Sequence, residues 1–168
     1  MLIEQSDPKE IDYLYREINN PTLLHFSKTK LPLQGNLQFD PASAYCYLKI
    51  VDDFIYKLYP LLQEKNIVIP DYFPPKTDCG AHISVLYPTE HQAPKIYRQL
   101  KSKKITSLFS FEIHGIFYLK IFNKIFYALG VNSAALRQLR LDCGLSTKLN
   151  YHGLLIPFHI TIAMGSTF

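Results

Sequence analysis

The sequence contains no tryptophan, two methionines and three cysteines among its 168 residues. The cysteines Cys46, Cys79 and Cys143 are odd in number and show no Cys-x-x-Cys spacing, which argues against a disulfide framework or a zinc knuckle. Free thiols fit a reducing compartment, so we expect a cytoplasmic protein. The polar residues 1–12 do not resemble a signal peptide, and no apolar run reaches the ~18 residues of a membrane span. We therefore expect no membrane partner.

The charge balance is mildly basic, with a formal net charge of +4 at pH 7. Such a charge is compatible with a phosphate-bearing ligand but does not require one. The densest cationic stretch, residues 101–104, is short and is more typical of a solvated helix end than of an arm that binds nucleic acid. A chain of 168 residues can bury a sizeable core, so we expect residues 1–168 to form a single domain. The sequence leaves the oligomeric state open, with a monomer as the simplest state.

Residues 1–66 are predicted to form a mostly helical N-terminal part. Asp7 and Pro8 have the chemistry of a helix start and predict a helix over residues 7–20. Apolar residues at alternating steps of four and three predict a second helix over residues 44–62. Residues 22–40 contain a proline and a glycine that interrupt any pattern, and we expect them to be irregular.

From residue 80 onward, strands and helices are predicted in alternation. Runs rich in aromatic and β-branched residues predict strands over 82–87, 109–119, 124–131 and 158–164. Helices are predicted over 93–103 and 132–144. Because hairpin strands occur together with helices, the predicted class is α+β, with largely antiparallel sheets and flanking helices.

The most informative pattern is apolar-His-apolar-Ser/Thr-apolar, which occurs around His82 and around His159. In a strand, residues i and i+2 point to the same face. His82 therefore shares a face with Ser84, and His159 shares a face with Thr161, while their apolar neighbours point into the core. A sheet with an apolar back and a His/hydroxyl front is suited to hold a polar ligand.

A bare His-x-Ser/Thr triplet is a weak signal in a chain with six histidines. A third copy at His25, Phe26 and Ser27 continues into a polar run and lies on no predicted strand, so we treat it as a chance match. A single histidine on a strand is also commonly a structural, hydrogen-bonded residue. The inference depends on two full five-residue patterns, each on a predicted strand.

The paired motifs resemble the signature of the two-histidine (2H) phosphoesterase superfamily, which includes LigT-like RNA cyclic phosphodiesterases and RNA-repair proteins. The resemblance covers about residues 80–164 and is specific mainly at His82, Ser84, His159 and Thr161. It implies a bilobed α+β fold with one motif on a central strand of each lobe, here with additional N-terminal helices. It also implies a hydrolase in which these four residues form the catalytic set.

The chemistry of the residues fits this implication. In-line attack on a phosphodiester needs a base on the incoming oxygen and an acid on the leaving oxygen, and two histidines supply both near neutral pH without a metal. Ser84 and Thr161 can donate hydrogen bonds to the non-bridging oxygens. We assign His82 as the acid and His159 as the base, although the residues alone leave the opposite assignment open. No His-x-His or His-x-x-x-His spacing favours zinc, so no cofactor or metal is expected.

The expected substrates are 2′,3′-cyclic phosphate ends of RNA, or small cyclic or 2′,5′-linked nucleotides. The alternative is a 2H-like module that binds RNA or a nucleotide without turning it over. Many LigT-like members carry an arginine soon after the second motif, where this chain has Ala163 and Met164. Either the charge on the phosphate is met elsewhere, with Lys120, Lys124 and Lys148 as candidates, or the choice of substrate differs from that of LigT-like members. Further candidate substrate contacts are His152 and three tyrosines, for which simple packing is the more common role, namely Tyr87, Tyr118 and Tyr151.

Overall fold

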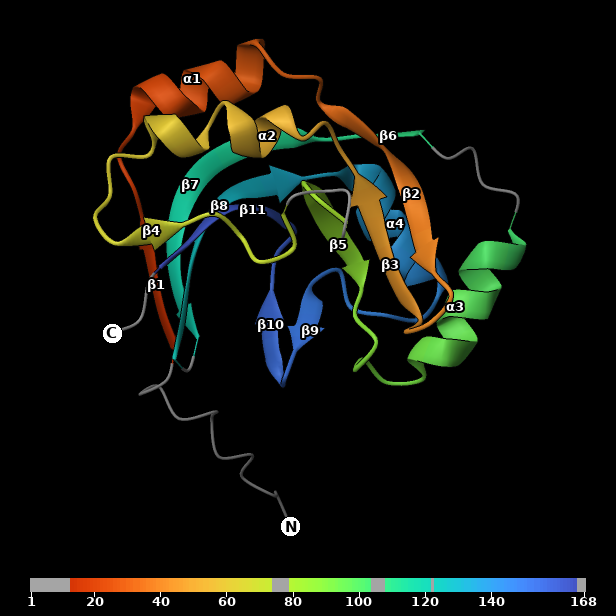
Figure 1. Ribbon diagram of the computed structural model, residues 1–168. Helices are drawn as coiled ribbons and strands as arrows, with labels where there is room; N and C mark the ends of the chain where they lie inside the picture. The colour runs from red at the N-terminus through yellow and green to blue at the C-terminus, as the bar shows by residue number, and fades with distance from the viewer. Residues whose placement is uncertain (1–12, 74–78, 104–107, 122, 166–168) are drawn as a thin grey trace.

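The structure is a computed structural model, which describes residues 13–73, 79–103, 108–121 and 123–165. Two curved antiparallel sheets and a short hairpin form its framework (Figure 1). The strands are β1 (Tyr13–Glu17), β2 (Gln34–Asp40), β3 (Tyr45–Lys49), β4 (Ile67–Val68), β5 (His82–Leu86), β6 (Leu108–Ser110), β7 (Glu112–Ile121), β8 (Lys124–Asn132), β9 (Leu149–Tyr151), β10 (Leu154–Ile156) and β11 (His159–Gly165). The helices are α1 (Pro21–Thr29), α2 (Asp53–Tyr56), the 3-10 helix η2 (Tyr59–Leu61), α3 (Ala93–Ser102) and α4 (Ala134–Asp142).

Each sheet carries one of the two motifs. The first sheet has the order β1-β7-β8-β11-β4 and contains the strand of His159. The second sheet has the order β5-β3-β2-β6 and contains the strand of His82 at one edge. All strand pairs in both sheets are antiparallel. The predicted α+β class with antiparallel sheets and flanking helices is therefore confirmed.

The two motif strands alternate as predicted between a buried face and a cleft face. Ile83 and Val85 on β5 are buried, as are Ile160 and Ile162 on β11. Burying one such side chain stabilises the fold by roughly 1.5–3 kcal/mol, so a one-residue shift in register would expose the whole apolar row. The apolar face of each strand therefore fixes the direction in which its histidine points.

The predicted helix over residues 7–20 is wrong where the structure describes it, because residues 13–17 form β1. The residues before 13 lie outside the described part. The Asn20-Pro21 pair starts a helix here and does not end one. The Asn20 side chain accepts a hydrogen bond from Leu23 N at 3.1 Å, and Pro21 occupies the first turn of α1. The stretch 22–40, expected to be irregular, holds most of α1 and all of β2.

The second predicted N-terminal helix is also largely wrong, so the N-terminal part is not mostly helical. Residues 45–49 form β3, in which Cys46 and Leu48 are buried and their neighbours are half-buried. The apolar residues of this stretch fit both the helical steps of three and four and the spacing of two that is typical of a strand. The stretch forms a strand because it pairs with β2 and β5. Helical structure follows only at α2 and η2.

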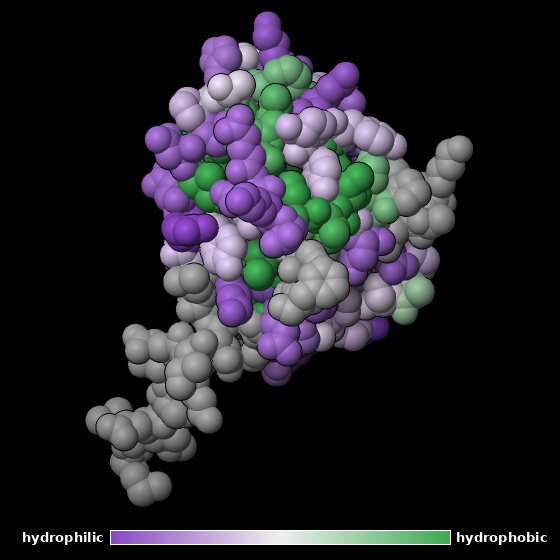
Figure 2. All heavy atoms as spheres, turned by 60° about the vertical axis from the view of Figure 1, so that its left-hand side comes forward, coloured by the Kyte–Doolittle hydropathy of each residue, from purple (hydrophilic) through white to green (hydrophobic). Residues whose placement is uncertain are grey.

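The elements predicted after residue 80 are confirmed within a few residues. They include β5, α3, β7, β8, α4 and β11. Helix α4 is capped by Ser133, whose side chain accepts a hydrogen bond from Leu136 N, and Leu141 on this helix is 51% exposed. On the side that carries β1 and β4, apolar side chains reach the surface between polar ones (Figure 2), and Val68 and Ile69 are among the exposed residues of this region. No helix in the described part of the chain is long and apolar enough to cross a membrane.

Candidate active site

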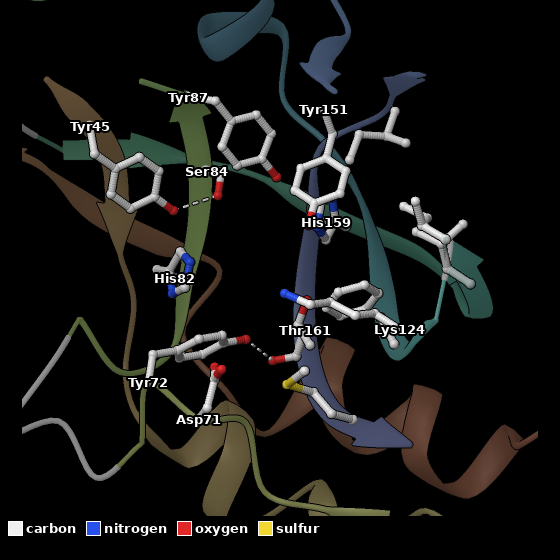
Figure 3. A pocket seen from close by; sticks show the side chains of 15 residues that line it. Tyr45, Asp71, Tyr72, His82, Ser84, Tyr87, Lys124, Tyr151, His159 and Thr161 are labelled. Atoms are coloured by element: carbon white, nitrogen blue, oxygen red, sulfur yellow. Dashed lines mark hydrogen bonds between the residues drawn. The ribbon is translucent and has the colours of Figure 1, made fainter. Parts of the chain in front are cut away.

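The edge strand β5 lies against β11, and the two motifs line one cleft between the sheets (Figure 3). The cleft has a volume of about 220 Å³. His82 and Ser84 contribute from β5, and His159 and Thr161 contribute from β11. The remaining lining residues are Tyr45, Asp71, Tyr72, Tyr87, Leu119, Ile121, Lys124, Phe126, Tyr151, Ile156 and Met164.

Both histidines are held in the same way by the backbone. His82 Nδ1 lies 2.7 Å from Gly80 O, and His159 Nδ1 lies 2.9 Å from Pro157 O. In each case the carbonyl belongs to the residue two positions before the histidine. A carbonyl oxygen only accepts, so Nδ1 carries the proton in both rings. Nε2 is then the nitrogen that gains or loses a proton in each histidine, which is the arrangement that a pair of general acid and base requires.

A tyrosine is in contact with each motif. The Tyr45 hydroxyl lies 2.6 Å from Ser84 Oγ, and the Tyr72 hydroxyl donates to Thr161 O at 3.4 Å. Tyr72 also packs edge-on against His82, with 4.8 Å between the ring centroids. When Tyr45 donates to Ser84, the serine proton is left to point at a ligand. Tyr45 thus orients the serine hydroxyl, and Tyr72 ties the loop before β5 to β11.

Three tyrosines of the cleft stay protonated at any physiological pH. Burial raises the pKa of Tyr87 to about 12, and it raises the pKa values of Tyr45 and Tyr72 well above the usual range. Tyr87 lies parallel to Tyr45 at 6.3 Å and edge-on to Tyr151 at 5.6 Å, measured between ring centroids. One side of the cleft is therefore built from neutral phenols, which offer aromatic faces and hydroxyl groups but no charge.

Formal charge is sparse around the cleft. Among the lining residues that the structure describes, Lys124 supplies the cation and Asp71 the carboxylate. Within the same part of the chain, no group of three or more His, Cys, Asp and Glu side chains is placed to hold a metal ion. The site thus combines two imidazoles, two hydroxyls, a single ammonium group and aromatic walls.

The model of a protein family, the Swiss Army Knife (SAK) 2H phosphoesterase domain, matches residues 46–167. The chain belongs to this 2H phosphoesterase family. The match covers well over half of the 168 residues and includes both sheets' motif strands. It begins before residue 80, so it extends the resemblance seen in the sequence toward the N-terminus. No curated protein and no solved structure matches the chain.

The second motif of this 2H phosphoesterase is followed by a β-bulge. The pairing of β11 with β8 shifts between Thr161 and Ala163, which inserts one extra residue into β11. As a result Met164, not Ala163, returns to the cleft face, while Ala163 is buried. The region where many LigT-like members carry an arginine is thus apolar on both faces here.

The 2H phosphoesterase cleft gathers seven of the nine site residues expected from the sequence. They are His82, Ser84, His159, Thr161, Tyr87, Tyr151 and Lys124. Tyr118 and His152 do not line it. Tyr118 points away from the cleft face of β7, under the guanidinium of Arg16 at 4.8 Å. His152 is exposed in the turn between β9 and β10, where a positive φ of 49° directs the chain around the hairpin.

The other lysine candidates also lie elsewhere. Lys120 is exposed on β7, and Lys148 lines a separate pocket behind the cleft. The chance triplet at His25 lies on α1, where residues i and i+2 do not share a face, and its imidazole is exposed. The interpretation of His25 as a chance match therefore agrees with the structure.

Tyr45, Tyr72 and Cys79 are site residues that the sequence reasoning missed. Cys79 Sγ lies 3.3 Å from His82 Nδ1, beside the carbonyl that holds this ring. A correct strand prediction for residues 45–49 would have placed Tyr45 on the face opposite Cys46 and Leu48. Nothing in the local sequence marks Tyr72, because a loop brings it to the cleft.

The electrostatics of His159 lead to a prediction on pH dependence. Burial of the imidazole lowers its pKa below the usual value of 6.5, and the bond to Pro157 O opposes this only in part. A histidine that stays neutral at neutral pH is suited to act as the base. We expect the acid limb of kcat/KM to have its midpoint below about 6.5. A pH profile on a cyclic nucleotide measures this, and a midpoint well above that value would contradict the assignment of His159 as the base.

The same shift affects stability in a defined direction. The unfolded chain takes up the His159 proton near about pH 6.5, before the folded protein does. Stability is therefore expected to fall as the pH drops from that value toward the lower folded pKa, and His159→Gln should weaken this dependence. Urea unfolding at several pH values measures the effect.

Proposed function

We propose that this 2H phosphoesterase hydrolyses 2′,3′-cyclic phosphate ends of RNA, or small cyclic or 2′,5′-linked nucleotides, by acid–base catalysis without a metal. One observation carries the proposal. Two histidines, each fixed through Nδ1 by a carbonyl two residues earlier and each with a hydroxyl residue two positions later, line the same cleft. Family membership supports phosphoesterase chemistry in general. A role in RNA processing or repair would follow from this substrate.

The proposed reaction assigns one step to each group. His159 Nε2 takes a proton from water, and the water oxygen attacks phosphorus. The bond from phosphorus to one ribose oxygen breaks, and His82 Nε2–H gives its proton to that oxygen. The product is a phosphomonoester beside a free hydroxyl, and exchange with solvent returns both histidines to their starting states. Ser84 and Thr161 donate to the non-bridging oxygens, where charge gathers in the transition state.

The hydroxyl groups give a direct prediction. Ser84→Ala or Thr161→Val should each lower kcat by about 10²–10³-fold, because each removes one donor to the developing charge. KM should change much less. Thr29→Val is the matched control, since the exposed Thr29 hydroxyl donates only to His25 O. Unchanged kcat in both site variants would contradict the proposed role of the hydroxyls.

The proposed function is tested by assaying the purified protein with EDTA on a panel of 2′,3′-cyclic and 2′,5′-linked nucleotides and on an RNA with a cyclic phosphate end. We expect hydrolysis of at least one cyclic substrate, with a rate that EDTA leaves unchanged. Loss of activity with EDTA and recovery with added metal would contradict the metal-independent mechanism. Binding of nucleotides without turnover would support the alternative of a non-catalytic module. The observation that favours this alternative is the aromatic wall of the cleft, on which a base can stack.

A further inference from the structure

A buried ion pair lies behind one wall of the cleft. Glu90 is 6% exposed and Arg140 is 2% exposed. The two are joined by a bidentate pair of hydrogen bonds, from Arg140 Nη2 to Glu90 Oε1 at 2.7 Å and from Arg140 Nη1 to Glu90 Oε2 at 3.0 Å. Neither residue lines the cleft. Charged side chains are seldom buried this deeply, so the pair requires a physical explanation.

Every donor of Arg140 is used. The three N–H groups that do not bind Glu90 donate to backbone carbonyls, namely Ser146 O at 2.6 Å, Val85 O at 2.7 Å and Lys148 O at 2.8 Å. A guanidinium has five N–H donors, and the carboxylate takes the other two. A guanidinium whose five N–H groups are all bonded within the protein has no donor left for an anionic ligand. The pair therefore acts as a structural cross-link and not as a ligand site.

The cross-link joins two separate chain segments. Glu90 accepts from Tyr87 N at 2.9 Å and from Asn150 N at 3.1 Å, so one carboxylate holds the end of β5 and the middle of β9. Tyr87 and Asn150 are far apart in the sequence, yet both bonds lie close to the cleft. Tyr87 itself lines the cleft, and Asn150 is the neighbour of a lining residue. Tyr151 follows Asn150, and its ring meets the Tyr87 ring at 5.6 Å. We call these two rings the tyrosine wall.

We propose that Glu90 and Arg140 are positioning residues that hold the tyrosine wall in place and thereby set the affinity of the cleft for the nucleoside part of its substrate. This inference rests on the proposed function. The two imidazoles have anchors of their own, because Gly80 O and Pro157 O bind Nδ1 of each ring. Disturbing the pair should therefore weaken binding much more than chemistry. Aromatic contacts to a base made equally in the ground and transition states affect KM and not kcat.

The variants Glu90→Gln and Arg140→Lys test the proposal in the full chain. Glutamine keeps the shape of Glu90 and removes its charge, and lysine keeps the charge of Arg140 but cannot form the planar fork. We expect KM for a 2′,3′-cyclic nucleotide to rise about tenfold, and kcat to stay within about threefold, which corresponds to loss of uniform binding. Glu112→Gln and Arg137→Lys are matched controls on exposed or half-exposed positions, and both should behave as the wild type.

A double-mutant cycle separates a positioning role from general destabilisation. Tyr151→Ala removes half of the tyrosine wall, so adding Glu90→Gln to it should raise KM by less than about twofold further if Glu90 acts through the wall. A full additional tenfold rise would overturn the proposal, and so would a fall in kcat with KM unchanged. Substrate without a base, such as abasic ribose 2′,3′-cyclic phosphate, should show no difference between Glu90→Gln and the wild type.

A readout without substrate keeps this inference distinct from the proposed function. In the wild type, proton NMR should show a nuclear Overhauser contact between the Tyr87 and Tyr151 rings, and slow exchange of the Tyr87 and Asn150 amides. Glu90→Gln and Arg140→Lys should weaken both signals while the Tyr45–Tyr47 contact at 5.2 Å persists. Protein that is inert on every substrate yet shows these changes would contradict the proposed function alone. Unchanged ring contacts and unchanged KM in both variants would overturn the positioning role.

Discussion

Replacing either His82 or His159 with alanine is expected to lower kcat by about 10²–10⁴-fold, because each change removes one of the two proton transfers. Loss of His159 leaves the attacking water without a base, and loss of His82 leaves the ribose oxygen without an acid. The measurement is hydrolysis of a 2′,3′-cyclic nucleotide by each purified variant. KM should change little, since Ser84, Thr161 and Lys124 still line the cleft in each variant and would remain available to the phosphate.

The pair should behave as a unit. The double variant His82→Ala/His159→Ala is expected to be hardly slower than the worse single variant, because groups that act in one step are not additive. The chain supplies a matched control in His25→Ala, which removes the exposed histidine of the third triplet and should keep full activity. Activity that survives both single substitutions at His82 and His159 would reject two-histidine catalysis.

Replacing Arg140 with methionine should lower the free energy of unfolding by about 3–5 kcal/mol, the usual result of removing one partner of a buried ion pair. The change leaves the Glu90 carboxylate buried without its countercharge and removes the donors to three backbone carbonyls. Urea unfolding followed by circular dichroism measures the loss.

The control for this prediction lies one turn away. Arg137 donates to Asn132 Oδ1 and is only half-buried, so Arg137→Met should cost less than about 1 kcal/mol. A loss below about 1 kcal/mol for Arg140→Met would show that the ion pair contributes little, which is the outcome typical of exposed pairs. That result would also remove the physical basis for the cross-link behind the tyrosine wall.

The part of the fold that carries the two motifs could be predicted because it follows from short-range rules. Alternation of apolar and polar residues identifies β5 and β11, and the same alternation determines the face of each histidine. Each motif is flanked by apolar residues that have to be buried, and this requirement turns the histidine of each motif toward the opposite face of its strand. The meeting of the two motifs in one cleft follows from the family resemblance, since no local rule joins strands that lie in different sheets.

The N-terminal part could not be predicted from the same rules. Residues 44–62 satisfy a helical period, but β3 is stabilised by pairing with β2 and β5, which no local pattern reveals. Asn20 and Pro21 suit either end of a helix by composition, and the side-chain bond from Leu23 N decides in favour of the start. Errors there hid Tyr45, which contacts Ser84.

Long-range contacts account for the remaining differences at the site. Tyr118 has the character of a stacking residue, but the register of β7 turns it toward Arg16 and away from the cleft. The β-bulge after Thr161 places Met164 on the cleft face, and Glu90 with Arg140 joins segments distant in sequence. These features depend on register and on tertiary hydrogen bonds, so a single sequence does not specify them in advance.

The most direct test of two-histidine catalysis is a crystal structure of the protein with a nucleoside–vanadate complex, which mimics five-coordinate phosphorus. We expect vanadium in the cleft, with Nε2 of His82 and Nε2 of His159 each about 2.6–3.2 Å from one of the two apical oxygens. Ser84 and Thr161 should donate to the equatorial oxygens. Vanadate bound outside the cleft, or in contact with only one of the two histidines, would contradict two-histidine catalysis.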